Sequence, residues 1–193
     1  MPRPKAFHPD EALEKAMGVF WLKGYEATSM EDLLAAMGIN RGSLYDTFGD
    51  KRQLFVKALD HYCQGIVGAK FGLLSQPGPA LPLLRQFLSG MLEGALADPQ
   101  RRGCLLANTV MELAPHEADI AAKLRRSLQM GEDAFLNLLV RAKEQGELRP
   151  DQDPRALARF LMTLFQGVIV MIKSGASEET IRESVAIGLA VLE

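Results

Sequence analysis

The sequence predicts an all-α protein of about nine helices, in which three short N-terminal helices form a helix-turn-helix domain and a larger helical region follows. Apolar residues recur at spacings of three and four along most of the 193-residue chain. In addition, the stretch from Thr28 to Lys51 divides at Gly38 into two short helical patterns. Because 48% of the residues are hydrophobic and no run reaches the ~18–20 apolar residues of a membrane span, we expect a soluble protein with no membrane partner.

A first helix is predicted from Pro9 or Asp10 to Lys23, where Gly24 ends it. Its apolar stripe should brace the helix-turn-helix. Residues 2–8 precede it, and Arg3 or Lys5 could enter a DNA minor groove. A disordered terminus explains the same residues equally well.

The helix-turn-helix itself is predicted from its capping residues. Ser29 and Asp32 have the spacing of a capping box, so a helix should begin near Ser29 and end at Gly38, which suits a left-handed C-cap. Asn40 is a good N-cap for a second helix through Phe48. A turn of this length with a glycine is the form of a helix-turn-helix.

The outward side chains of the second helix carry hydrogen-bonding groups. Arg41 and Ser43 can donate to phosphates or base edges, Gly42 allows a close backbone approach, and Tyr45 and Thr47 offer hydroxyls. Asp50 should then cap a further helix, which has two cations in its first turn. A helix N-terminus beside cations can clamp a phosphate, and Lys51 is our candidate for that contact.

This stretch resembles the N-terminal DNA-binding domain of the TetR family of transcriptional regulators over about residues 10–56. The pattern that carries the resemblance is Thr28-Ser29-x-x-Asp32-Leu33, Ala36-x-Gly38-Ile39-x-Arg41-Gly42-Ser43-Leu44-Tyr45, Phe48-x-x-Lys51 and Leu54-Phe55. The resemblance implies a DNA-binding domain at residues 1–56 and an effector-binding and dimerisation domain at residues 57–193. It implies that Thr28, Ser29, Arg41, Gly42, Ser43, Tyr45, Thr47 and Lys51 contact DNA.

The same resemblance implies a homodimer that pairs through its last two helices and binds a near-palindromic operator in double-stranded DNA. It also implies a repressor that an unknown small molecule releases. On spacing alone, the alternative is a helical interaction module that binds no DNA. The net charge of −2 counts mildly against nucleic acid, but the cations of residues 1–60 gather in local patches.

The rest of the chain reads as further helices. A lever helix should run from Asp50 to about Lys70, before a linker at residues 75–79. The remaining helices are predicted at 81–96, 104–113, 116–145, 153–172 and 178–192. The last two are apolar over more than one face, so each needs partners on more than one side.

A ligand pocket of the kind that the resemblance implies has ten candidate residues in the body. Asn108 and Glu112 are the most informative, because a buried polar group on an apolar helix must find a partner, either a ligand or a protein group. The apolar candidates could equally be ordinary core. The full set is Phe87, Met91, Asn108, Met111, Glu112, Phe135, Leu139, Met162, Phe165 and Gln166.

Two cysteines in a chain without a signal peptide are expected to be free thiols in the cytoplasm. Cys104 follows Arg101 and Arg102 at a predicted helix start, a setting that favours the thiolate, so an electrophile or redox sensor is a further alternative. Cys63 should be inert packing. With three dispersed histidines and no nucleophile or phosphate-loop motif, we expect no metal site, no cofactor and no enzymatic activity.

Overall fold

The computed structural model describes residues 7–192 and is all-helical over that range, without a strand. This confirms the predicted fold class. The candidate arm residues Arg3 and Lys5 lie outside the described residues. The helices are α1 (Pro9–Lys23), α2 (Met30–Met37), α3 (Arg41–Phe48), α4 (Lys51–Tyr62), α5 (Gly68–Gly72), α6 (Ala80–Leu96), α7 (Leu105–Glu112), α8 (Ala118–Glu144), α9 (Pro154–Ser174) and α10 (Glu178–Ala190).

The predicted lever helix is helical throughout, but it is not a single α-helix. A π-helical turn at Cys63–Val67 separates α4 from α5, and a 3₁₀ turn follows at Leu73–Ser75. Since α4, the π turn and α5 follow one another without a break, they correspond to one of the nine predicted helices. A π turn is set by local hydrogen-bond register, which side-chain periodicity does not report.

The first three helices pack around aromatic and aliphatic side chains of α1 and α4. Phe20 is fully buried, and its ring meets the ring of Phe55 edge-on with centroids 5.0 Å apart. Leu33 and Leu44, the inward residues of α2 and α3, are buried in the same core. The two short helices are therefore held by this packing, because helices of eight residues are too short to be stable alone.

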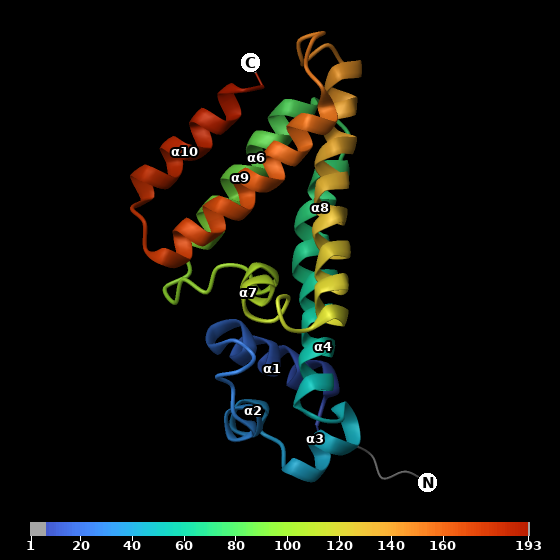
Figure 1. Ribbon diagram of the computed structural model, residues 1–193, viewed down its shortest axis with the longest axis vertical. Helices are drawn as coiled ribbons and strands as arrows, with labels where there is room; N and C mark the ends of the chain where they lie inside the picture. The colour runs from blue at the N-terminus through green and yellow to red at the C-terminus, as the bar shows by residue number, and fades with distance from the viewer. Residues whose placement is uncertain (1–6, 193) are drawn as a thin grey trace.

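The body is built on α8, which runs along the α4–α5 segment and packs against α9 and α6 (Figure 1). The short helix α7 lies between the head and the body and contacts α1 and α4 as well as α8 and α9. Head and body side chains consequently belong to one continuous core. The domain boundary after residue 56 stays a prediction.

Apolar side chains remain on the surface of the last two helices. Ile187 is 72% exposed, and Phe160, Val170, Met171 and Val191 are also exposed. Within residues 7–192, α9 is the one helix long and apolar enough to cross a membrane, by length and composition only. One such helix is weak evidence for a membrane span, because the core helices of soluble proteins pass the same test.

Candidate nucleic-acid interface and ligand cavity

Capping bonds at both ends of the turn hold α2 and α3 in place. The backbone N–H of Asp32 donates to Ser29 Oγ, and the backbone N–H of Ser29 donates to the Asp32 carboxylate, each at 3.0 Å. Gly38 has φ +67°, the left-handed C-cap that its position predicted. At the start of α3, Asn40 accepts a hydrogen bond from the backbone N–H of Ser43 at 2.8 Å. The capping predictions are thus confirmed.

The outward face of α3 carries the predicted DNA contacts. Arg41, Gly42 and Tyr45 are exposed, and Ser43 and Thr47 are half-buried. Arg41 forms an ion pair with Glu31 at 3.2 Å, but both side chains are mostly exposed, so this pair holds the guanidinium weakly. The side chain of Arg41 can therefore turn to a phosphate or base at little cost.

Thr28 lies differently from the other residues of this set. Its side chain is 1% exposed, and its hydroxyl donates to the carbonyl of Gly24 at 2.5 Å. A buried hydroxyl that is already bonded cannot reach a phosphate directly. Thr28 therefore shapes the turn before α2, whereas Ser29 stands at the exposed helix start.

The two cations at the start of α4 have different surroundings. Lys51 Nζ lies 4.5 Å from the centroid of the Tyr25 ring, which leaves its charge unneutralised. Arg52 instead pairs with Glu117 at 2.7 Å and with Asp119 at 2.5 Å, at the start of α8. These bonds raise the pKa of Arg52 and lower that of Asp119. The expected phosphate clamp of two cations is thus reduced to Lys51.

Two residues of this face had no signal in the sequence. Lys57, in the second turn of α4, donates to the carbonyl oxygens of Thr47 and Phe48 and so satisfies the C-terminal end of α3. Tyr25 provides the ring beneath Lys51. Both contacts join segments that are not neighbours in a helical repeat, so periodicity could not reveal them.

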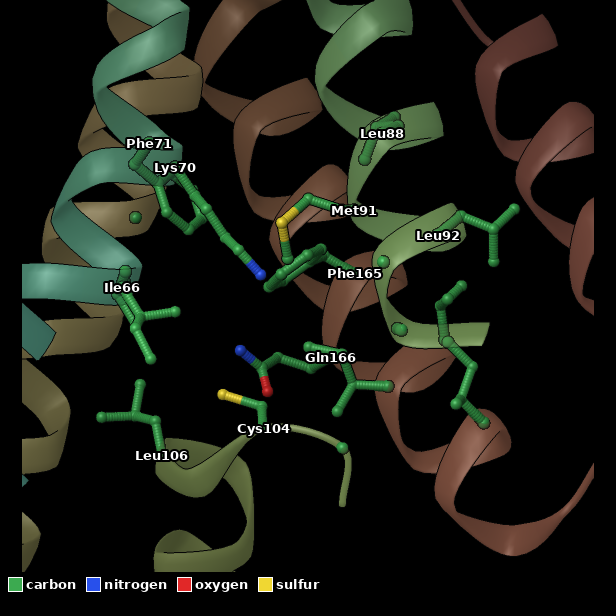
Figure 2. Close-up of a pocket in the computed structure, with 18 of the residues that line it drawn as sticks. Ile66, Lys70, Phe71, Leu88, Met91, Leu92, Cys104, Leu106, Phe165 and Gln166 are labelled. Carbon is green, nitrogen blue, oxygen red and sulfur yellow. The ribbon is translucent and has the colours of Figure 1, made fainter. Parts of the chain in front are cut away.

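A cavity of about 130 Å³ lies in the body, between the α4–α5 segment, α6, α8, α9 and the loop before α7 (Figure 2). Four of the ten predicted pocket residues line it: Met91, Met162, Phe165 and Gln166. Phe87 and Phe135 do not. They belong to the aromatic cluster behind it, where the Phe71 ring lies 5.1 Å from the first and 5.5 Å from the second. Leu139 is fully buried core.

The three candidates on α7 face away from this cavity. Met111 is 57% exposed. Glu112 accepts hydrogen bonds from the backbone N–H groups of Tyr25 and Glu26, so its partner is the turn after α1. The Asn108 amide donates to the carbonyl of Arg102, while its buried Oδ1 has no protein partner. These three residues lie outside this cavity, and their part in binding an effector stays a prediction, because α7 is apolar on most sides and its pattern does not define which side faces the cavity.

The cavity has lining residues that the sequence did not single out, among them Trp21, Tyr62 and Lys70. Cys104 also lines it and is buried, at the N-cap of α7. The hydroxyl of Tyr62 donates to Cys104 Sγ at 3.4 Å, and burial together with the neighbouring Cys104 raises the pKa of Tyr62. Burial likewise raises the pKa of Cys63, in keeping with inert packing.

Two family models match this chain, one near its N-terminus and one in the larger helical region. Residues 12–58 match the family described as bacterial regulatory proteins, tetR family, and residues 80–187 match the tetracyclin repressor-like C-terminal domain. The chain is 39% identical to the uncharacterized HTH-type transcriptional regulator YezE of Bacillus subtilis strain 168 over the whole of both chains. It is 32% identical to the HTH-type transcriptional repressor ComR of Escherichia coli strain K12, covering 94% of this chain and 87% of ComR.

Solved structures give the same result. A cysteine variant of the TetR family transcriptional regulator CifR, complexed with 26 bp double-strand operator DNA, superposes with a TM-score of 0.88 at 30% identity. The match covers 99% of this chain and 100% of that chain.

Proposed function

The chain belongs to the TetR family of transcriptional regulators, and we propose from this premise that it is a repressor that binds a near-palindromic operator through α3 and is released by a small molecule. The observation that carries the proposal is the exposed outer face of α3, held rigidly by capped helices on both sides of the turn. Such regulators are soluble and typically non-enzymatic, and we place this one in the cytoplasm without a catalytic role.

Each proposed DNA contact has a distinct part in this function. Arg41, Gly42 and Ser43 meet base edges and nearby phosphates, because they lie on the outer side of α3, and the exposed Tyr45 holds the DNA backbone. Lys51 holds a phosphate at the start of α4, where the helix N-terminus adds favourable N–H groups. Ser29 and Thr47 contact the DNA backbone at the edges of the interface. Thr28 does so indirectly, because its bond to the Gly24 carbonyl shapes the turn that carries Ser29.

A homodimer would place two α3 helices on one face of the duplex. We propose that α9 and α10 pair with their counterparts in a second subunit. The exposed apolar side chains of these two helices support this arrangement, since a large apolar surface is usually covered by a partner. Twofold symmetry of the protein then requires a palindromic operator.

The cavity supports release by a small molecule. It is enclosed mainly by apolar side chains and includes Trp21, which belongs to α1 of the head. A ligand in this cavity would therefore touch both the body and the head. An alternative trigger is modification of the Cys104 thiol, which lines the same cavity, by an electrophile or oxidant. If Cys104→Ser still binds DNA but is no longer released by such a reagent, Cys104 is the trigger.

Selection of bound sequences from a random duplex pool, using the purified full chain, tests the proposal. We expect an enriched palindrome for the wild type and its loss in Arg41→Ala and Tyr45→Ala. Arg125→Ala provides a matched control, because Arg125 is an exposed arginine on α8, away from α3. No enrichment at low salt, or equal enrichment in all variants, would instead favour a helical interaction module that does not bind DNA.

A further inference from the structure

Most polar groups around the cavity already have protein partners. Arg102 pairs with Asp98 at 3.0 Å, and its guanidinium lies 4.3 Å from the centroid of the Trp21 ring. Trp21 Nε1 donates to the carbonyl of Gly103 at 3.1 Å, and the Tyr62 hydroxyl donates to Cys104. These groups need no ligand to satisfy them, and the pair of Arg102 with Asp98 adds no net charge to the lining.

Lys70 and Gln166 are the exceptions. Within the described residues, neither the ammonium of Lys70 nor the side-chain amide of Gln166 has a hydrogen-bond or ion-pair partner. Figure 2 shows both polar ends pointing into the cavity from opposite walls, Lys70 from the segment after α4 and Gln166 from α9. Among the described residues that line the cavity, the one acid is Asp98, and it is bound to Arg102. The cavity thus presents one unneutralised positive charge.

The remaining lining sets the size and character of a ligand. Around the two polar ends stand Ile66, Phe71, Met91, Leu92, Leu106 and Phe165. A volume of about 130 Å³ is close to the ~150 Å³ of an apolar cavity known to bind benzene. A molecule of this size with a long polar chain would leave the apolar walls unmatched, so one polar end and one apolar body fit best.

We propose that the effector cavity takes a small carboxylic acid, whose carboxylate is bound by Lys70 and Gln166 and whose apolar body packs against α6 and α9. The inference rests on the proposed ligand-released regulator and adds the chemical class of its ligand. A carboxylate accepts hydrogen bonds from both groups and neutralises the ammonium, whereas an amide satisfies the geometry but not the charge.

Trp21 makes the proposal directly measurable. It is the chain's single tryptophan, and it lines the cavity, so its fluorescence reports on occupancy without a label. The purified full chain is titrated with butyrate, hexanoate, octanoate and benzoate, and in parallel with hexanamide and hexylamine. We expect Trp21 fluorescence to change saturably when a carboxylate is added. Hexanamide and hexylamine should bind at least about tenfold more weakly than hexanoate.

Variants locate the carboxylate. Lys70→Met removes the charge and keeps a long apolar side chain, and it should weaken carboxylate binding about tenfold while leaving hexanamide binding unchanged. Gln166→Met should weaken carboxylate binding about fivefold. Lys15→Met is the matched control, because Lys15 is an exposed lysine on α1 outside the cavity, and it should change nothing. Far-ultraviolet circular dichroism verifies that each variant is folded.

Three results overturn the inference. They are equal binding of carboxylate, amide and amine, carboxylate binding that Lys70→Met leaves intact, and absence of binding by all four acids. These failures differ from failure of the proposed function. An operator recovered from the duplex pool but released only by a neutral molecule contradicts the ligand class alone, whereas carboxylate binding without any operator contradicts the regulator and leaves the ligand class standing.

Discussion

At the scale of single residues, Asp32 links the first two helices of the DNA-binding head. Its carboxylate accepts from the backbone N–H of Ser29 and pairs with Lys23 at 2.6 Å. The hydrogen bond from Lys23 and those from Ser29 lower the pKa of Asp32 to about 2. One side chain, itself only half-buried, thereby ties the end of α1 to the start of α2.

This pKa shift predicts a pH dependence of stability. The pKa of Asp32 is lower in the folded state, so its ionised form stabilises the fold above the ordinary value of 3.8, and this contribution is lost as the pH falls through about 2. Asp32→Asn should therefore lower the melting temperature at pH 6, and the difference from the wild type should shrink between about pH 4 and pH 2. Thermal unfolding followed by circular dichroism measures it, and a constant difference would contradict the assignment.

The two kinds of DNA contact should separate in their salt dependence. Lys51→Ala removes one phosphate contact, so it should weaken binding to all sequences similarly and reduce the slope of log K against log salt by about one. Ser43→Ala should change the sequence preference and leave the slope unaltered. Fluorescence anisotropy with operator and random duplexes measures both. Equal losses on both duplexes for both variants would contradict this division of roles.

At the scale of helices, α7 holds the head through one carboxylate. Glu112 accepts from the N–H groups of Tyr25 and Glu26 at 3.0 and 2.9 Å. The preceding Gly24 has φ +83°, and a Cβ there would lie 2.9 Å from the Glu112 carboxylate. Glycine is therefore needed at this turn both for its backbone conformation and for the closeness of α7.

Removal of this carboxylate should destabilise the head. Glu112→Ala leaves two backbone N–H groups without their charged acceptor, and we expect a loss of about 1–2 kcal/mol in the free energy of unfolding. Urea denaturation measures the change. Glu144→Ala, at an exposed glutamate near the end of α8, is the matched control and should cost less than about 0.5 kcal/mol. Equal effects of both substitutions would contradict the role of Glu112.

A second link between helices joins α4 to α8. Arg52 is held by Glu117 and Asp119, and Asp60, two turns further along α4, pairs with Lys123. The start and the end of α4 are thus both attached to the first turns of α8. Because α4 begins at Lys51, displacement of α8 by a ligand would move the proposed phosphate contact.

At the scale of the whole molecule, the exposed apolar surface of α9 and α10 predicts a dimer that a single charge can disrupt. Ile187→Glu places a carboxylate at a residue that is 72% exposed in the single chain but buried in the proposed interface. We expect monomers in analytical ultracentrifugation and weaker operator binding. Met130→Glu, at an equally exposed position on α8, should leave the dimer intact. If both variants remain dimeric, the interface lies elsewhere on the molecule.

Much of the fold and the geometry of the candidate DNA-binding surface could be predicted because the signals are local. Ser29, Gly38, Asn40 and Asp50 define helix ends through bonds to residues within four positions, so their identities and spacing suffice. The outward face of α3 follows from the inward positions of Leu44 and Phe48 on the same helix. The all-helical class follows from repeated apolar spacing.

The cavity and the links between head and body were decided by tertiary structure. Glu112 caps a turn 86 residues away in the chain, and Arg52 bonds to an acid 65 residues away, so no short pattern relates them. Lys70 and Gln166 meet in one cavity only because α9 packs beside the segment that contains the π turn. The sequence by itself determined where the helices begin and end, since helix ends depend on short-range capping bonds. It also determined which helix positions are apolar. The direction each polar side chain faces depends on how the helices pack, and only the folded chain defines that.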